Sequence, residues 1–143
     1  MKTSRTPWST KLRPDMKPEV VDDPKTPGKL LLPTPALVAE EIRRVRKGSL
    51  LTFSQLRERL ASRQGADRSC PLMTGIFFNI VAGAAEELIA ADKKALAPYW
   101  RVVRDDGTLS PKTPAGQERQ AEHLRQEGHD VEADGPKLRV HLP

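Results

Sequence analysis

The sequence of 143 residues has only one cysteine, three histidines and six aromatic residues, counting three Phe, two Trp and one Tyr. A single cysteine cannot form an internal disulfide, and one cysteine with three scattered histidines does not supply the ligands of a zinc site. We therefore expect no disulfide, no bound metal and no cofactor, and we expect a reducing, cytoplasmic location.

Long apolar runs are also missing. No stretch approaches 18 apolar residues without a charge, and no apolar run follows the basic residues at the start of the sequence. We therefore expect neither a membrane span nor a secretory signal.

Charge of one sign is in modest excess, with a formal net charge of +5. Residues 1–97 contain 17 Lys and Arg against 11 Asp and Glu, whereas residues 98–143 contain 7 against 8. A basic balance is compatible with phosphate binding, and here it gives weak support for a nucleic-acid partner.

Residues 1–33 contain six prolines and little apolar periodicity. Proline interrupts both helices and sheets, so this segment is predicted to be an extended arm. Trp8 and Leu12 are candidate anchors for the arm, and residues 30–32 are a candidate short strand. The remaining residues, 34–143, are predicted to form one small domain.

Within this domain, start and stop signals predict four helices and one hairpin. Thr, Ser or Pro residues at the starts and Gly residues at most of the ends delimit helices within 34–48, 52–65, 69–92 and 114–128. Asp134-Gly135 then separates two short strand-like runs. This order predicts an α+β fold that is mostly helical, typical of a winged helix-turn-helix domain with a small C-terminal β-hairpin.

Residues 98–107 read Pro-Tyr-Trp-Arg-Val-Val-Arg-Asp-Asp-Gly. This run resembles the Pro-Cys-His-Arg-Val-Val active-site segment of the alkylguanine-DNA alkyltransferases, with Tyr99 at the position of the catalytic cysteine and Trp100 at that of the histidine. It is closest in kind to the alkyltransferase-like proteins, which make a comparable replacement and keep the lesion-binding pocket without the acceptor thiol.

The resemblance runs from about Leu37 to Leu142. Residues 46–56 resemble the family's Pro-x-Gly-x-Val-x-Thr-Tyr-Gly-Gln-Ile segment, and the closing Gly, Gln, Leu and Glu-Gly residues also have counterparts. One departure concerns the family's Arg-Ala-Val-Gly motif, whose arginine enters the duplex. Its best counterpart is residues 72–75, Leu-Met-Thr-Gly, which contain no arginine.

The resemblance implies a set of residues for binding DNA. Tyr99 and Trp100 are predicted to form a stacking wall for an extruded base, the alternative being that they fill the core. Phe53 is predicted to lie against the target phosphodiester, and Ser54 and Gln55 are predicted to meet a phosphate at a helix start. Thr74 is a candidate contact on the recognition helix. The candidate basic contacts to phosphates are Arg101, Arg104 and Lys112.

Several of these residues also have ordinary structural interpretations. Core packing is an alternative for Phe53, and helix capping is an alternative for Ser54 and Gln55. Arg101 is an alternative brace that bonds backbone carbonyls, and exposed basic side chains such as Lys112 often only solvate the surface.

Methyl transfer is not expected at Tyr99, because the acceptor must be a strong nucleophile and a phenol with a pKa near 10 is a poor one. Cys70 begins a predicted helix, whose dipole favours a thiolate, so it is a candidate reactive thiol; small-residue packing is the alternative.

The sequence therefore predicts a non-enzymatic protein that binds double-stranded DNA, flips an O-alkylguanine or another modified base, and signals to repair proteins. The alternative is a winged-helix module for protein interaction that has lost DNA binding. The apolar third helix with its acidic end, residues 71–92, favours this alternative.

Overall fold

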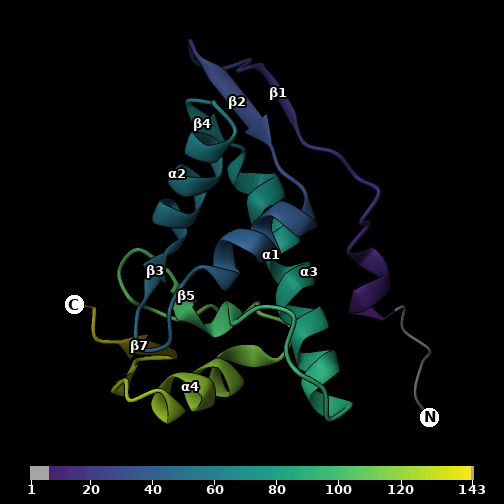
Figure 1. The fold of residues 1–143 in the computed structure, drawn as a ribbon. Coiled ribbons are helices and arrows are strands. Elements are labelled where there is room, and N and C mark those ends of the chain that lie inside the picture. Colours follow the sequence, from purple (N-terminus) through teal and green to yellow (C-terminus); the bar gives the residue numbers. More distant parts are fainter. Residues whose placement is uncertain (1–6, 143) are drawn as a thin grey trace.

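The computed structural model describes residues 7–142, which form four α-helices, two short 3-10 helices and seven strands (Figure 1). In chain order these elements are η1 (Trp8–Lys11), β1 (Glu19–Asp22), β2 (Lys29–Leu32), α1 (Pro35–Arg43), β3 (Leu51–Thr52), α2 (Phe53–Arg63), β4 (Arg68–Ser69), α3 (Pro71–Ala90), η2 (Tyr99–Arg101), β5 (Val102–Val103), α4 (Gly116–Gln126), β6 (Val131–Asp134) and β7 (Lys137–Val140).

The strands form three small sheets around the helices. β2 pairs antiparallel with β1 and parallel with β4, β3 pairs parallel with β5, and β6 pairs antiparallel with β7. The predicted α+β class is confirmed, and the four helices and the C-terminal hairpin lie where the sequence signals place them.

Local capping explains where the helices begin. The Thr34 side chain accepts a hydrogen bond from the Leu37 amide at 3.1 Å at the start of α1. Thr52 and Gln55 form a reciprocal capping box at the start of α2. Proline at the first position of α3 has no amide hydrogen to leave unpaired, so this helix also begins at low cost.

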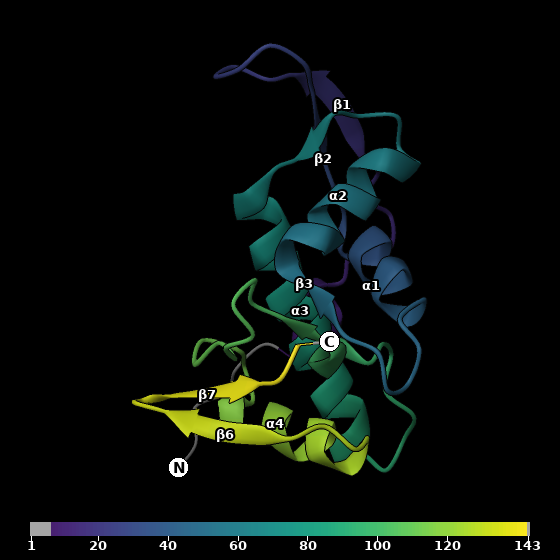
Figure 2. The same ribbon diagram turned by 90° about the vertical axis from the view of Figure 1, so that its left-hand side faces the viewer.

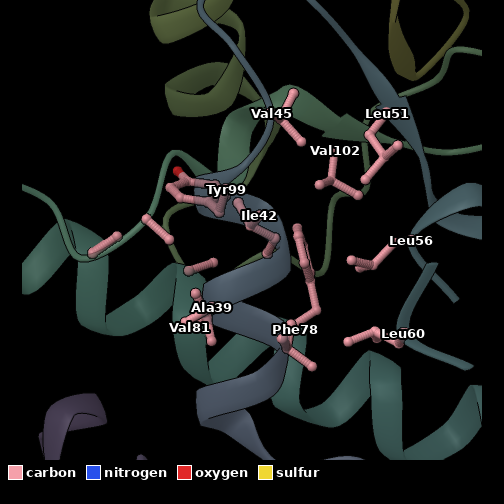
Figure 3. Packing of buried hydrophobic residues seen from close by; sticks show 14 of the residues in the cluster. Ala39, Ile42, Val45, Leu51, Leu56, Leu60, Phe78, Val81, Tyr99 and Val102 are labelled. Carbon is pink, nitrogen blue, oxygen red and sulfur yellow. The ribbon is translucent and has the colours of Figure 1, made fainter. Parts of the chain in front are cut away.

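The main core lies between α1, α2, α3 and the segment around η2 (Figure 3). Ile42, Leu56, Val81 and Tyr99 are fully buried there. A second cluster joins α4 to the β6–β7 hairpin through Leu109, Leu124, Val140 and their neighbours, and Trp100 packs against both clusters. The aromatic segment is therefore the junction of the two cores.

The beginning of the described chain packs on α3 (Figure 1, purple). The amides of Trp8 and Ser9 donate to the two carboxylate oxygens of Glu87, at 2.6 and 2.9 Å. The indole of Trp8 lies against Gly83 so closely that a Cβ placed there would lie 2.2 Å from Trp8 Cγ. Trp8 is thus an anchor of this segment, as the sequence suggested.

The prediction of an extended arm is wrong for residues 19–32. β1 and β2 form a hairpin at one end of the molecule (Figure 2), and β2 continues the sheet into β4. Leu31 is fully buried in the main core. Backbone pairing with β4 gives the proline-bounded segment a partner that its own sequence pattern does not reveal. The folded domain therefore begins before residue 34.

Helix α3 is long and apolar enough to cross a membrane by length and composition alone, which the expectation of no membrane span overlooked. Half of its most apolar window is buried inside the fold. Its core-facing side chains include Phe78 and Val81, so packing within this fold accounts for part of its apolar composition.

Candidate nucleic-acid interface

A large cavity lies between α2, the first half of α3 and the segment that follows β5. Its volume is about 960 Å³, and we call it the α2–α3 pocket. Its walls combine apolar side chains with polar and charged ones: Phe53, Ser54, Arg57, Pro71, Leu72, Gly75, Ile76, Phe78, Asn79, Val102, Val103, Arg104, Asp105, Asp106, Ser110, Lys112, Thr113 and Gln120. A pocket of this size accommodates a ligand as large as a nucleobase.

Local structure fixes the two sides of this pocket. The parallel pairing of β3 with β5 holds the start of α2 beside residues 102–106. Gly107, at φ +88°, then turns the chain; a Cβ there would lie 2.7 Å from the Val140 carbonyl oxygen. Only glycine lets this loop approach the C-terminal hairpin so closely.

Three basic side chains line the pocket. Arg57 projects from α2, and Arg104 and Lys112 come from the segment after β5. Within residues 7–142, none of the three forms a salt bridge with a carboxylate. Unpaired cations around a hollow favour a ligand with negative charge. The predicted phosphate contacts of Arg104 and Lys112 are therefore compatible with their positions.

The start of α2 is occupied by a carboxylate of the chain itself. The Ser54 amide donates to Asp105 Oδ1 at 3.0 Å, and the Ser54 hydroxyl donates to Oδ2. These hydrogen bonds and the charge of Arg57 hold the pKa of Asp105 below its ordinary value. Gln55 uses its side chain for the capping box. In this structure, the predicted phosphate contacts of Ser54 and Gln55 are thus replaced by internal ones.

Two buried polar side chains also line the pocket. Thr113 is 4% exposed, and its hydroxyl has no hydrogen-bond partner among the described residues. The amide nitrogen of Gln120 is held by the carbonyls of Trp100 and Val102, at 3.2 and 2.9 Å. An unsatisfied buried hydroxyl is costly, and a ligand in the pocket is one way to satisfy it.

Tyr99 does not line the pocket, so its predicted role as a stacking wall is wrong for this structure. Its side chain is fully buried among the core residues (Figure 3). Its hydroxyl donates to Glu86 Oε2 at 2.6 Å. Burial and the neighbouring Glu86 carboxylate raise the pKa of Tyr99, because both disfavour the phenolate. The alternative of core packing describes this residue.

Trp100 is half-buried and also lies outside the pocket. Its ring stacks on His123, with centroids 3.9 Å apart, and its indole nitrogen donates to Glu127 at 3.0 Å. Its predicted stacking face is therefore occupied by an internal partner. The ring packs against both cores.

Arg101 is held from within the protein. Its guanidinium donates to the Val45 carbonyl and to Glu127, both at 2.7 Å, and its side chain is 13% exposed. It therefore braces the loop and is not available to a phosphate in this structure. Burial opposes ionisation of Glu127, but the hydrogen bonds from Arg101 and Trp100 outweigh it and lower the pKa of that carboxyl.

Sequence reasoning missed the hub of this internal network, Glu86. Its carboxylate accepts from Tyr99, Arg119 and His123, at 2.6, 3.0 and 2.9 Å. Burial opposes ionisation of Glu86, but these three hydrogen bonds together outweigh it and lower the pKa of this carboxyl below its ordinary value. One signal was present: Glu86 follows Phe78 and Ala82 at steps of four residues, which places it on the buried stripe of α3.

The other predicted site residues are dispersed. Phe53 is half-buried, lines the pocket and packs edge-on against Phe78, with centroids 6.3 Å apart. Thr74 is fully buried and donates to the Cys70 carbonyl, so its predicted contact with nucleic acid is wrong for this structure. Cys70 is partly exposed at the N-cap of α3, outside the pocket lining.

Comparison with protein-family models and with curated proteins finds no match. Two solved structures are similar in fold. S. pombe Atl1 in complex with damaged DNA containing O6-carboxymethylguanine has a TM-score of 0.55 and 16% sequence identity, covering 75% of this chain and 87% of that chain. S. pombe ATL in complex with DNA has a TM-score of 0.54 and 20% identity, covering 76% and 89%. The chain therefore has an alkyltransferase-like fold.

Proposed function

We propose that this protein binds double-stranded DNA through a winged helix-turn-helix and holds a flipped, alkylated or otherwise modified base in the α2–α3 pocket. The α2–α3 pair supplies the helix-turn-helix, and the β6–β7 hairpin supplies the wing. The observation that carries the proposal is the pocket itself, which is large enough for a base and carries three unpaired basic side chains. The similar fold of Atl1, whose structure contains damaged DNA, supports it.

The geometry shifts the base-binding role away from Tyr99 and Trp100. Phe53 and Phe78 are the aromatic side chains that line the pocket. Within residues 7–142, the Thr113 hydroxyl and Arg57 Nε are buried polar groups of this pocket without a hydrogen-bond partner. An aromatic wall and a polar floor are the elements that hold an extruded base. We therefore assign the base to the space between Phe53 and Thr113.

The protein acts without transferring the alkyl group. Tyr99 occupies the position of the acceptor, and its buried hydroxyl donates to Glu86 with a raised pKa, so it is a poor nucleophile. Binding without chemistry makes the protein a marker of the lesion that recruits repair enzymes. Transfer of a labelled methyl group from DNA to the protein, at Cys70 or elsewhere, would contradict this assignment.

The test is a fluorescence titration of duplexes that differ only in one O-alkylguanine, repeated at several salt concentrations. Lys112→Gln should weaken binding to both duplexes and reduce the slope of log affinity against log salt by about 1. Lys93→Gln removes the same charge just beyond the far end of α3 and serves as the control. An equal effect of both variants, or no binding at low salt, would overturn the proposal.

The alternative of a protein-interaction module has one observation in its favour. Leu72 and Ile76 on α3 are 71% and 49% exposed, and exposed apolar side chains can mark a surface for a protein partner. If the folded chain binds no DNA, this module becomes the better interpretation.

A further inference from the structure

Residues 7–12, which we call the docking segment, lie on one face of α3 (Figure 1, purple). Two successive amides of this segment, those of Trp8 and Ser9, donate to the Glu87 carboxylate at 2.6 and 2.9 Å. The Trp8 indole covers Gly83. These contacts join the docking segment to α3 directly, so they do not depend on the path of the chain that links the two.

Residues 13–18, which we call the hinge, connect the docking segment to β1 and are loosely held. Five of the six residues are exposed, and Met16 is half-buried. Among the described residues, the hinge forms one backbone hydrogen bond, from the Met16 amide to the Arg13 carbonyl, and it lies within the hinge itself. Pro14 and Pro18 have no amide hydrogen to donate. The hinge can therefore change its conformation with little loss of contacts.

The hinge also contains a strained residue. Arg13 has a φ of +49°, in the left-handed region that favours glycine. An arginine there is strained because its Cβ lies too close to the backbone. A hinge that extends returns Arg13 to an ordinary backbone conformation, and its six residues then span about 20 Å.

We propose that the face of α3 formed by Gly83 and Glu87 receives the docking segment of a second copy of this chain, in a reciprocal exchange that produces a symmetric dimer. The exchanged form keeps the docking contacts and releases the strain at Arg13, and a strained hinge favours such an exchange. The partner is identified by the segment already seated on this face, whose indole fits against Gly83 and whose amides fit one carboxylate. This inference does not depend on the proposed function.

The closed monomer competes with the dimer, because a short linker holds the docking segment at an effective concentration on the order of millimolar. Analytical ultracentrifugation without DNA should therefore show a dimer fraction that rises with protein concentration up to about 1 mM. Arg13→Gly relieves the strain of the closed hinge, so it should raise the dissociation constant of the dimer at least about fivefold. Lys17→Gly is the matched control, because it adds a glycine to the hinge at a residue without positive φ.

A mixture of two variants distinguishes exchange from association through another surface. Trp8→Ala removes the indole but keeps the face of α3, whereas Gly83→Leu blocks that face but keeps the docking segment. Each variant alone should stay monomeric, and an equal mixture should form a dimer, because the segment of one copy docks on the other.

Three results would overturn the proposal. The first is a wild-type protein that stays monomeric at about 1 mM, and the second is a dimer that persists in Trp8→Ala. The third is an equal response of the dimer to Arg13→Gly and Lys17→Gly. This last comparison uses two exposed hinge residues, so it decides the question even if Gly83→Leu does not fold.

Discussion

Two neighbouring regions around β5 differ in how their polar groups are satisfied. Around Tyr99 and Trp100, each polar side chain named above has an internal partner, and Glu86 and Glu127 are the two acceptors that hold the network together. In the part of the chain that the structure describes, the Thr113 hydroxyl of the α2–α3 pocket has no hydrogen-bond partner, and the three basic side chains of the pocket form no salt bridge with a carboxylate. The first region has the properties of a structural junction, and the second has those of a binding site.

A side chain whose type is typical of a binding site can bind a ligand only if its hydrogen-bonding groups are not already used inside the protein. Two adjacent aromatic residues beside an arginine are typical of a ligand-binding site. Here Tyr99, Trp100 and Arg101 form their hydrogen bonds with other residues of the protein. Less conspicuous residues such as Arg57 and Thr113 retain unused hydrogen-bonding capacity. Variants of both regions test this difference, and one further variant tests the docking of Trp8 on α3.

The largest effect is expected from Tyr99→Ala. Removing a fully buried aromatic ring should lower the free energy of unfolding by about 3–5 kcal/mol, measured by urea denaturation. Phe53→Ala, at the half-buried pocket wall, should cost less stability and reduce the preference for modified DNA instead. A Tyr99→Ala protein of unchanged stability that lost only this preference would reverse the two assignments.

The next effect concerns Gly83, where the docked Trp8 leaves no room for a methyl group. Gly83→Ala should destabilise the full chain by about 1–3 kcal/mol because of overpacking. In a chain that starts at residue 13, the same substitution should stabilise by about 0.5–1 kcal/mol, since alanine favours helix more than glycine. Thermal melts of the four proteins decide; destabilisation by a similar amount in both backgrounds would show that the Trp8 contact is not the cause.

A smaller effect should appear in acid. The pKa values of Glu86 and Glu127 lie below their ordinary value of 4.5 in the fold. The stability they contribute is therefore complete above about pH 5 and is lost as the pH falls through the folded pKa values. Urea midpoints between pH 6 and pH 3 should fall less steeply in Glu86→Gln than in the wild type. Equal slopes would show that this network does not govern acid unfolding.

The smallest effect is expected at the start of α2. Asp105→Asn removes the internal anion that occupies the Ser54 amide, so a phosphate would bind there with less competition. DNA affinity should rise by about twofold to fivefold, the equivalent of about 0.4–1 kcal/mol. Asp106→Asn removes the same charge beside it, but this carboxylate bonds Thr108. An equal gain in both variants would assign the effect to net charge.

Much of the fold could be predicted from the sequence because its signals are local. Thr34, Thr52 and Pro71 identify the helix starts through contacts within one turn. The pairing of β2 with β4 could not be predicted in this way, since Leu31 and Ser69 are far apart in the chain. The same limit explains why the prediction of an extended arm is wrong for residues 19–32.

The candidate site shows the same difference between local signals, which the sequence reveals, and contacts between distant residues, which it does not. The resemblance to one motif predicted that Tyr99 and Trp100 bind a base. Whether these side chains can contact a ligand depends on Glu86, Glu127 and His123, which lie elsewhere in the sequence. Arg57 was missed because nothing in the sequence of its helix distinguishes it from Arg59 or Arg63. Its role depends on the distant segment that closes the pocket.

The docking of Trp8 on α3 also bears on the order in which the chain folds. Trp8 and Glu87 are 79 residues apart, so during synthesis residue 8 emerges well before its partner exists. β2, the central strand of its sheet, likewise precedes its partner β4 by more than 30 residues. The segment around Trp8 can therefore dock only after α3 has formed. Contacts between residues so far apart in the chain close long loops, which slows folding. A ribosome-bound chain that stops before residue 71 should leave Trp8 open to protease.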